Sequence, residues 1–181
     1  MFSGKKTLSA SVNEYDRLGN GIYFWEHNAR RAHDFAREVR DQPRHRGQKV
    51  KQPAVVGAVI DLGHCLNLQD AASIDMVRDS HRDLLAFLNE SNAPIPANSG
   101  GNDRLLRRLD CAVIEFLHEA RKNQDKEPFD SVRALFLEGE AVYEHAGFFA
   151  KSHIQLCVRN TACIKGYFRP LGSDGRPLSL A

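Results

Sequence analysis

The sequence predicts an α+β domain built on a mixed or mainly antiparallel sheet. Three observations predict this class. An aromatic strand and a short helix come first, two segments with apolar residues at helical spacing fill the middle, and three strand-like segments follow one another near the end. The chain has 181 residues, of which 42% are hydrophobic and 27% charged, as is ordinary for a globular protein. This length favours a single domain over residues 1–181, with two small domains as the alternative.

The first predicted strand follows a glycine turn that ends at Gly21. The segment "GIYFWE" has the aromatic and branched residues typical of a strand. Alternation along it gives two faces, one with Ile22 and Phe24 and the other with Tyr23 and Trp25. On the residues alone, Tyr23 is either part of the core or the floor of a ligand site.

A helix and a second strand are expected next. Asn28 is a suitable N-cap for a helix from about Ala29 to Val39, and the basic segment "DQPRHRGQKVKQP" after it has the composition of a loop. The run "AVVGAVIDL", from Ala54 to Leu62, is almost continuously apolar, which predicts a central strand buried on both faces. The segment "GHCLNL" that follows is expected to be a turn.

Two helices are predicted to form an insertion of about residues 70–123. Asp70 can cap the first helix, which runs through Asn89, and the second runs from about Asp103 to Lys122. The loop "NESNAPIPANSGGN" separates them by composition. Apolar residues repeat at helical spacing in the second helix: Leu105, Leu106, Leu109, Ala112, Val113, Phe116 and Leu117.

Three strands are predicted in the last third of the chain, from "SVRALFLEGEAVY", "SHIQLCVRN" and "CIKGYFRP", before a loose tail of about residues 170–181. In the second strand, His153 and Gln155 share one face. In the first, Glu138 and Glu140 share a face if the strand is regular through Gly139. This E-x-E is either a pair of carboxylates that stabilises a developing positive charge or two solvent-facing glutamates on an edge strand.

Charge and cysteine content narrow the function classes. The net charge of +2 gives no global field for nucleic acid, although the stretch from Arg30 to Lys51 is strongly basic. That stretch either attracts phosphates or is a solvated helix face with its trailing loop. The four cysteines form no CxxC and no zinc spacing. With no signal-peptide pattern and no apolar run long enough to span a membrane, we expect a reduced, cytoplasmic protein without membrane contact.

Several common chemistries have no motif in this sequence. The chain lacks a Walker P-loop, a G-x-G-x-x-G fingerprint, an H-E-x-x-H pair and a nucleophile elbow. The histidines are scattered, so no metal site is predicted. A small metal-free nuclease that uses scattered His and Arg is a minor alternative, and it requires His153 within hydrogen-bond reach of another His or Lys.

Two segments together resemble a known family. "LGNGIYFWE…RRAHDFA" is similar to the tyrosine-bearing strand and following helix of the ADP-ribosyltransferase fold in its His-Tyr-Glu branch, and "EGEAVYEHAGFFAKSHIQLCV" is similar to that family's E-x-E-containing turn and strand. The resemblance covers about residues 17–169. It implies an ADP-ribosyltransferase-like α+β fold that uses NAD as substrate and no metal.

The resemblance also assigns roles to individual residues. Tyr23 matches the tyrosine that stacks on nicotinamide, Glu140 matches the catalytic glutamate and Glu138 its partner. The remaining cofactor-binding candidates are Gly21 in the glycine turn and His153 and Gln155 on the downstream strand. Breaking the nicotinamide–ribose bond passes through an oxocarbenium-like state, which a glutamate and a stacking aromatic ring can stabilise.

The function implied by this resemblance is mono-ADP-ribosyl transfer from NAD to a nucleic acid or protein target by a bacterial toxin-like protein. Toxin–antitoxin or phage-defence systems are the expected setting, with an antitoxin protein as a partner. The alternative is a catalytically inactive binding module of the same fold. That alternative follows because "MFSGKKTLSASVNEYDRL" shows no histidine-bearing first strand, which would leave a sheet edge exposed.

Overall fold

The computed structural model describes residues 8–41 and 50–171, and they form a mixed α+β structure, as predicted. The main sheet has the strand order β1 (Ile22–Trp25), β7 (His153–Val158), β6 (Ser131–Phe136) and β3 (Cys65–Asn67). β7 is antiparallel to both β1 and β6, whereas β3 is parallel to β6. The strand that carries His153 is therefore central, and the aromatic strand lies beside it.

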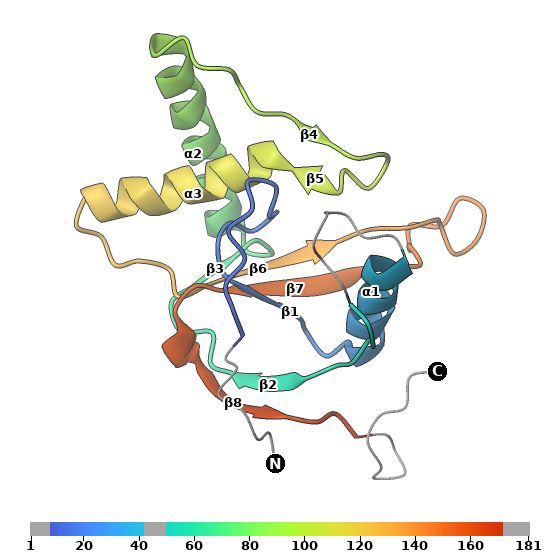
Figure 1. Cartoon of the computed structure of the whole chain (residues 1–181). Coiled ribbons are helices and arrows are strands. Elements are labelled where there is room, and N and C mark those ends of the chain that lie inside the picture. The colour runs from blue at the N-terminus through green and yellow to red at the C-terminus, as the bar shows by residue number, and fades with distance from the viewer. Residues whose placement is uncertain (1–7, 42–49, 172–181) are drawn as a thin grey trace.

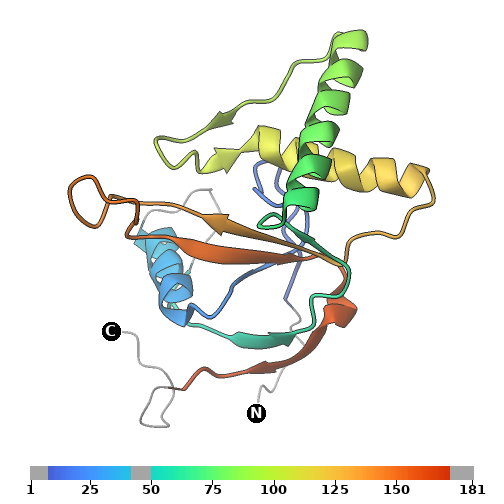
Figure 2. The same cartoon turned by 180° about the vertical axis from the view of Figure 1, so that it is seen from behind.

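Two smaller ribbons accompany the main sheet. β2 (Gly57–Ile60) pairs with β8 (Ile164–Phe168), and the short β4 (Asn98–Ser99) pairs with β5 (Leu106–Arg107). The β2–β8 ribbon lies on one side of the main sheet and the long helices lie on the other (Figures 1 and 2). The chain is thus arranged in layers, with the main sheet in the middle.

Two of the three helices, α1 and α2, begin where the sequence supplies a side-chain cap. α1 (Ala29–Asp41) starts after Asn28, whose Oδ1 accepts a hydrogen bond of 2.9 Å from the Arg31 N–H. α2 (Ala71–Glu90) starts after Asp70, whose carboxylate accepts one of 3.1 Å from the Ser73 N–H. Both caps are as predicted, because each side chain satisfies an N–H group that the first helical turn leaves unpaired.

The third helix begins five residues later than predicted. α3 spans Arg108–Asn123, and the residues before it form β5 instead. The Asn98 side chain on β4 accepts a hydrogen bond of 3.0 Å from the Leu109 N–H, which fixes the helix start from outside the helix. Apolar periodicity alone could not locate that start, since the capping group lies eleven positions upstream.

Two expectations in residues 54–67 are wrong. The apolar run from Ala54 forms β2, which pairs only with β8 and leaves Val59 57% exposed, so it is not a strand buried on both faces. The segment expected to be a turn contains β3, which pairs with β6 and buries Leu66 completely. A continuous apolar run does not distinguish a central strand from a ribbon that covers another layer, and a three-residue strand has no periodicity to detect.

The core lies between the helices and the main sheet. Its fully buried members include Leu66 on β3, Val132 on β6 and Cys157 on β7. Residues of α3 such as Ile114 and Leu117 close it from above the sheet. The four cysteines, all within the described residues, are free thiols.

Candidate functional site

The pairing of β1 with β7 brings the predicted binding residues onto one face. Tyr23 lies opposite Cys157 and Trp25 lies opposite Gln155. Because side chains alternate along each strand, His153 and Gln155 point to the same side of the sheet as Tyr23 and Trp25. α1 lies beside this end of the sheet, where β6 ends and β7 begins (Figure 1).

Tyr23 is anchored to the glycine turn before it. Its hydroxyl donates a hydrogen bond of 2.7 Å to the Gly19 carbonyl oxygen and accepts one of 3.0 Å from the Leu18 N–H. Its ring packs against the core cluster, and this burial raises the pKa of the phenol well above its usual value. The hydroxyl therefore has a structural role, and only the ring remains for contact with a ligand.

The close approach of the neighbouring strand β7 explains why position 21 is a glycine. A Cβ at this position would lie 2.5 Å from the Cys157 sulfur and 2.8 Å from the Val158 carbonyl oxygen. The Gly21 backbone also pairs with Ser11 through hydrogen bonds of 2.8 and 3.0 Å. Close approach of β7 accounts for this glycine without a cofactor.

The two glutamates of the E-x-E segment were expected to share a face only if the strand were regular through Gly139, and that condition is not met. β6 ends at Phe136, and Gly139 adopts a φ of 80°, so the strand is not regular between the two glutamates. Glu138 is 2% exposed, whereas Glu140 is exposed on the following loop. Gly139 turns the chain through the left-handed region, which a residue with a Cβ seldom adopts.

Glu138 is held by arginines from two distant segments. Arg17 forms an ion pair with one carboxylate oxygen, and Arg31 on α1 lies 3.8 Å from the other. The Lys151 N–H donates a hydrogen bond of 2.8 Å to the Glu138 carbonyl oxygen. Burial lowers the pKa of Arg17, and the adjacent Glu138 carboxylate opposes that effect. A buried carboxylate needs such partners, because an unpaired buried charge is costly.

The helical insertion contributes a third arginine to this end of the sheet. The Arg17 and Arg107 guanidinium carbons lie 4.5 and 5.1 Å from the centre of the Phe136 ring. Asp103 accepts a hydrogen bond of 3.1 Å from the Gly139 N–H, so the insertion also fixes the turn after Glu138. None of these arginines was singled out from the sequence. The signal that could have found them is the general need of a buried glutamate for cationic partners.

His153 is buried and neutral. Its Nδ1 lies 2.7 Å from the Lys151 carbonyl oxygen and so carries the proton, which leaves Nε2 as a hydrogen-bond acceptor. Burial lowers the pKa of the imidazole, and the hydrogen bond to Lys151 opposes that effect. Its partner is a backbone oxygen, and Nε2 has no partner within the described residues, so the condition set for a nuclease is not met.

Six buried side-chain atoms at this end of the sheet lack a hydrogen-bond partner within residues 8–41 and 50–171, and two of them are Arg107 Nε and Ser152 Oγ. The other four are Trp25 Nε1, Arg31 Nε, His153 Nε2 and Gln155 Oε1. We call these four residues the unpaired quartet. The rings of Trp25 and His153 are 6.4 Å apart, and Trp25 lies directly across the ladder from Gln155. Unpaired buried polar atoms are rare in folded proteins and call for a water or a ligand.

A cavity of about 830 Å³ lies between β1, α1 and the β2–β8 ribbon, and of the quartet Trp25 alone lines it. Its volume lies within the range of small-molecule sites. Trp25 belongs both to the quartet and to the cavity wall, where its ring lies 4.9 Å from that of Phe35. Aromatic side chains from several elements line the cavity: Tyr23, Phe24, Trp25, Phe35 and Phe168.

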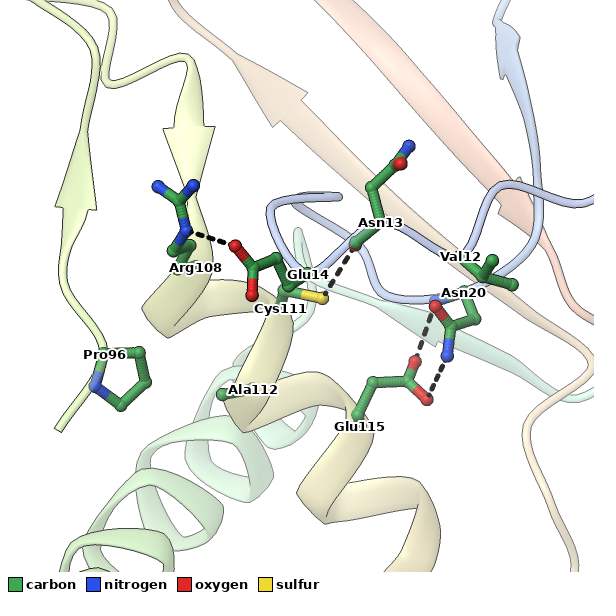
Figure 3. Close-up of a pocket in the computed structure, with 9 residues that line it drawn as sticks. All are labelled: Val12, Asn13, Glu14, Asn20, Pro96, Arg108, Cys111, Ala112 and Glu115. Carbon is green, nitrogen blue, oxygen red and sulfur yellow. Dashed lines mark hydrogen bonds and ion pairs between the residues drawn. The ribbon is translucent and has the colours of Figure 1, made fainter. Parts of the chain in front are cut away.

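A second, smaller cavity of about 390 Å³ lies between α3 and residues 12–20 (Figure 3). Its charged groups are paired. Glu115 accepts hydrogen bonds of 2.8 and 3.0 Å from the backbone and side chain of Asn20 and also pairs with Arg159. Glu14 accepts one of 2.8 Å from Arg108. These contacts join the N-terminal segment to the helix, and among the described residues each charged group of this cavity has a partner.

Two searches of the described residues were negative. No helix there is long and apolar enough to cross a membrane, and no group of three or more His, Cys, Asp or Glu side chains is arranged to hold a metal ion. Comparison of the chain with family models, with curated proteins and with solved structures found no significant match. The functional interpretation therefore depends on the residues and their geometry.

Proposed function

We propose that this chain has an ADP-ribosyltransferase-like fold and transfers a single ADP-ribose unit from NAD to a macromolecular acceptor. One observation carries the proposal. The aromatic strand β1 pairs with β7 so that Tyr23 and Trp25 share a face with His153 and Gln155, beside Glu138 and an aromatic cavity. These are the residue types that the reaction needs, gathered from segments far apart in the chain.

The chemistry assigns each group a task. The bond between nicotinamide and the ribose C1′ breaks, nicotinamide leaves with the bonding electrons, and an acceptor nucleophile forms a bond to C1′ and loses a proton. A carboxylate stabilises the oxocarbenium-like ribose by charge and by accepting a hydrogen bond from its 2′-hydroxyl. Aromatic rings of the cavity, Tyr23 and Trp25 among them, can stack on the flat nicotinamide.

Glu138 is the better candidate for the carboxylate than Glu140. Glu138 is buried two residues after β6 ends, where its carbonyl oxygen accepts a hydrogen bond from the Lys151 N–H, while Glu140 lies exposed beyond the Gly139 turn. In the free protein the Glu138 carboxylate forms ion pairs with Arg17 and Arg31. The phosphates of NAD compete for those guanidinium groups, since arginine binds phosphate and carboxylate with the same geometry.

The acceptor and setting follow from the same proposal. The basic residues of α1 favour a nucleic acid over a protein as acceptor, and the rest of the basic stretch, residues 42–49, lies outside the described residues. A bacterial toxin-like role in the cytoplasm, with an antitoxin as partner, belongs to this proposal as well.

A second candidate, a non-catalytic binding module, is favoured by a different observation. The Glu138 carboxylate is held by arginines, and the Tyr23 hydroxyl is held by its own glycine turn. A module that only binds a ligand does not need either group to be free. The two candidates differ in whether NAD is consumed.

Incubation with labelled NAD and cell extract separates the two candidates. We expect label transfer and nicotinamide release with the wild type, loss of both in Glu138→Gln, and retention of both in Glu140→Gln. Glu127→Gln, at a glutamate that is 76% exposed, is a matched control. Circular dichroism verifies that each variant is folded. A folded wild type that neither consumes NAD nor transfers label contradicts the enzyme and favours the binding module.

A further inference from the structure

We infer that the cavity between β1 and the β2–β8 ribbon is a docking site for an extended apolar segment of a partner protein, which adds to the main sheet as a strand beside β1. Three observations carry this assignment: an unpaired backbone edge on β1, a second strand edge across the cavity, and an apolar lining between the two. Docking of a peptide at this edge goes beyond the proposed function, because it requires no reaction with NAD.

β1 has one edge without a strand partner among residues 8–41 and 50–171. It lies at the end of the strand order of the main sheet and pairs only with β7. The Glu26 N–H donates a hydrogen bond of 3.0 Å to the Ile154 carbonyl oxygen, so in this antiparallel ladder the backbone groups of Phe24 and Glu26 point toward β7. The N–H and C=O groups of Tyr23 and Trp25 therefore point away from β7, and they offer a donor and an acceptor at each residue.

The same edge already pairs once, just before β1 begins. The Ser11 N–H donates a hydrogen bond of 2.8 Å to the Gly21 carbonyl oxygen, and the Gly21 N–H donates one of 3.0 Å to the Ser11 carbonyl oxygen. This is an isolated antiparallel bridge. Gly21 lies two residues before Tyr23, so its outward backbone groups belong to the same alternating set. The bridge shows that this set is oriented for antiparallel pairing, and within the described residues the pairing stops there.

The wall of the cavity opposite β1 is a second strand. β1 lies between β7 and the β2–β8 ribbon (Figures 1 and 2), and within the described residues β2 pairs only with β8. The lining of the cavity runs without a gap through residues 23–29 and 54–60. Because successive side chains of a strand point to opposite faces, such a continuous lining indicates that β1 and β2 meet the cavity along their edges. An extended chain, with backbone donors and acceptors on both of its edges, is the complement of this space.

The side chains of the lining define the chemistry of the docked segment. Small residues stand among the aromatic ones and leave room for larger side chains of a ligand: Ala29, Ala32, Ala36, Ala54, Gly57 and Ala58. Glu26 is the only carboxylate among the described lining residues, and it pairs with Arg133 over 2.6 Å. We therefore expect a segment about as long as the four residues of β1, with large apolar side chains on both faces and no proline.

A synthetic peptide of alternating valine and phenylalanine, acetylated, amidated and flanked by lysines for solubility, is the probe. We expect it to bind the intact chain saturably and to change the fluorescence of Trp25, the only tryptophan. The same peptide with N-methyl groups on alternate residues keeps every side chain but loses the backbone donors of one edge. It should bind at least about tenfold more weakly, whichever alternate set is methylated.

Ala32→Met tests the site at the level of the protein. Ala32 lines the cavity from α1, so the longer side chain fills space that the segment needs and should weaken peptide binding at least about tenfold. The matched control, Ala86→Met, makes the same change at an exposed position of α2 and should bind the peptide like the wild type. Circular dichroism verifies that both variants are folded.

Amide hydrogen exchange of the wild-type chain tests the edge directly. In the free protein the amides of Tyr23 and Trp25 should exchange faster than those of Phe24 and Glu26, and the peptide should protect them. Amides of Tyr23 and Trp25 that are already protected in the free protein, no peptide binding, or binding that neither N-methylation nor Ala32→Met weakens would each overturn the docking site. Nicotinamide is assigned to the same cavity, so the peptide should also slow NAD consumption, and this consequence alone rests on the proposed function. Peptide binding without any NAD consumption keeps the docking site and contradicts the enzyme, whereas NAD consumption without peptide binding does the reverse.

Discussion

A buried or half-buried glutamate held by arginine lies near each end of the central strand β7. The two ends differ in how many other buried polar atoms lack a hydrogen-bond partner. Near the C-terminal end of β7, Glu115 pairs with Arg159 and Asn20, and both carboxylate oxygens have partners. Near its N-terminal end, Glu138 pairs with Arg17 and Arg31, and the polar atoms of the quartet at the same end lack partners among the described residues. Among the described residues, the first end leaves one such buried atom, His118 Nε2, without a partner, whereas the second leaves several.

This difference teaches how to separate a structural ion pair from a candidate site. Burial alone would raise the pKa of Glu115, but hydrogen bonds from Arg159 and the Asn20 N–H outweigh it, so the pKa is lowered and the group stays charged. The hydrogen bonds from Asn20 to Glu115 join residues before β1 to α3 (Figure 3). At the other end, the arginines pair with Glu138, but several other buried donors and acceptors have no hydrogen-bond partner among the described residues. Unsatisfied groups, not charge pairs as such, indicate where a ligand is expected.

The largest expected effect is from removing one arginine near the N-terminal end of β7. Arg17→Met leaves the 2%-exposed Glu138 with only the more distant Arg31, and should lower the free energy of unfolding by about 3 kcal/mol. Urea denaturation measures this loss. Arg78→Met, in an exposed pair with Asp75, is the control and should cost less than about 1 kcal/mol. A loss for Arg17→Met no larger than that of the control would show that Glu138 does not depend on the pair.

The next effect concerns acid stability near the C-terminal end of β7. Burial, reinforced by the nearby Arg159, lowers the pKa of His118 on α3 from 6.5 to about 4. Between these two pH values the unfolded chain binds a proton that the folded chain excludes, so stability falls as the pH falls. Wild type should lose about 2 kcal/mol more than His118→Phe between pH 7 and 4. His145→Gln, at a fully surface-exposed histidine, is the control, and parallel curves for wild type and His118→Phe would contradict the assignment.

A smaller effect is expected from Glu115→Gln. Glu115 and Arg159 are 30% and 20% exposed, so solvent screens the pair, and the loss in unfolding free energy should be about 1 kcal/mol. Nicotinamide binding and NAD consumption per folded molecule should be unchanged, because the quartet lies at the other end of β7. Reduced activity at equal folded fraction would remove the distinction between the two ends.

The smallest effect has the opposite sign. Gln155→Leu removes a buried acceptor that has no partner in the described residues, and should raise the melting temperature by about 2–4 °C, equivalent to about 1 kcal/mol for a chain of this size. Differential scanning calorimetry without added amide measures the shift. A stabilised variant that no longer binds nicotinamide is the expected combination, since sites often cost stability. A clear loss of stability would mean that Gln155 is satisfied in the free protein.

Local sequence patterns predicted the helices and strands better than they predicted which strands pair with each other. Alternation in "GIYFWE" and "SHIQLCVRN" placed Tyr23, Trp25, His153 and Gln155 on the correct sides of their strands, because period two is a property of the strand itself. The caps Asn28 and Asp70 were also found, since they act within three residues. The pairing of β1 with β7, which puts these faces together, was not predicted because it depends on tertiary contacts.

The candidate site was predicted only in part, for the same reason. The E-x-E interpretation assumed a regular strand through Gly139, and the positive φ there separates Glu138 from Glu140. Arg17 lies 121 positions from Glu138 in the sequence, so no local pattern links them. Arg31 was seen only as part of a basic helix. Long-range charge partners emerge when the fold brings them together.

A crystal structure of the chain with nicotinamide tests the central claim most directly. That claim is that the unpaired atoms at the α1 end of β7 are completed by a ligand. We predict that the ring lies in the aromatic cavity with its amide oxygen within about 3 Å of Trp25 Nε1, the quartet atom whose side chain lines that cavity, and with the Glu115 contacts unchanged. Water molecules at all four positions, with nicotinamide elsewhere or absent at saturating concentration, would contradict it.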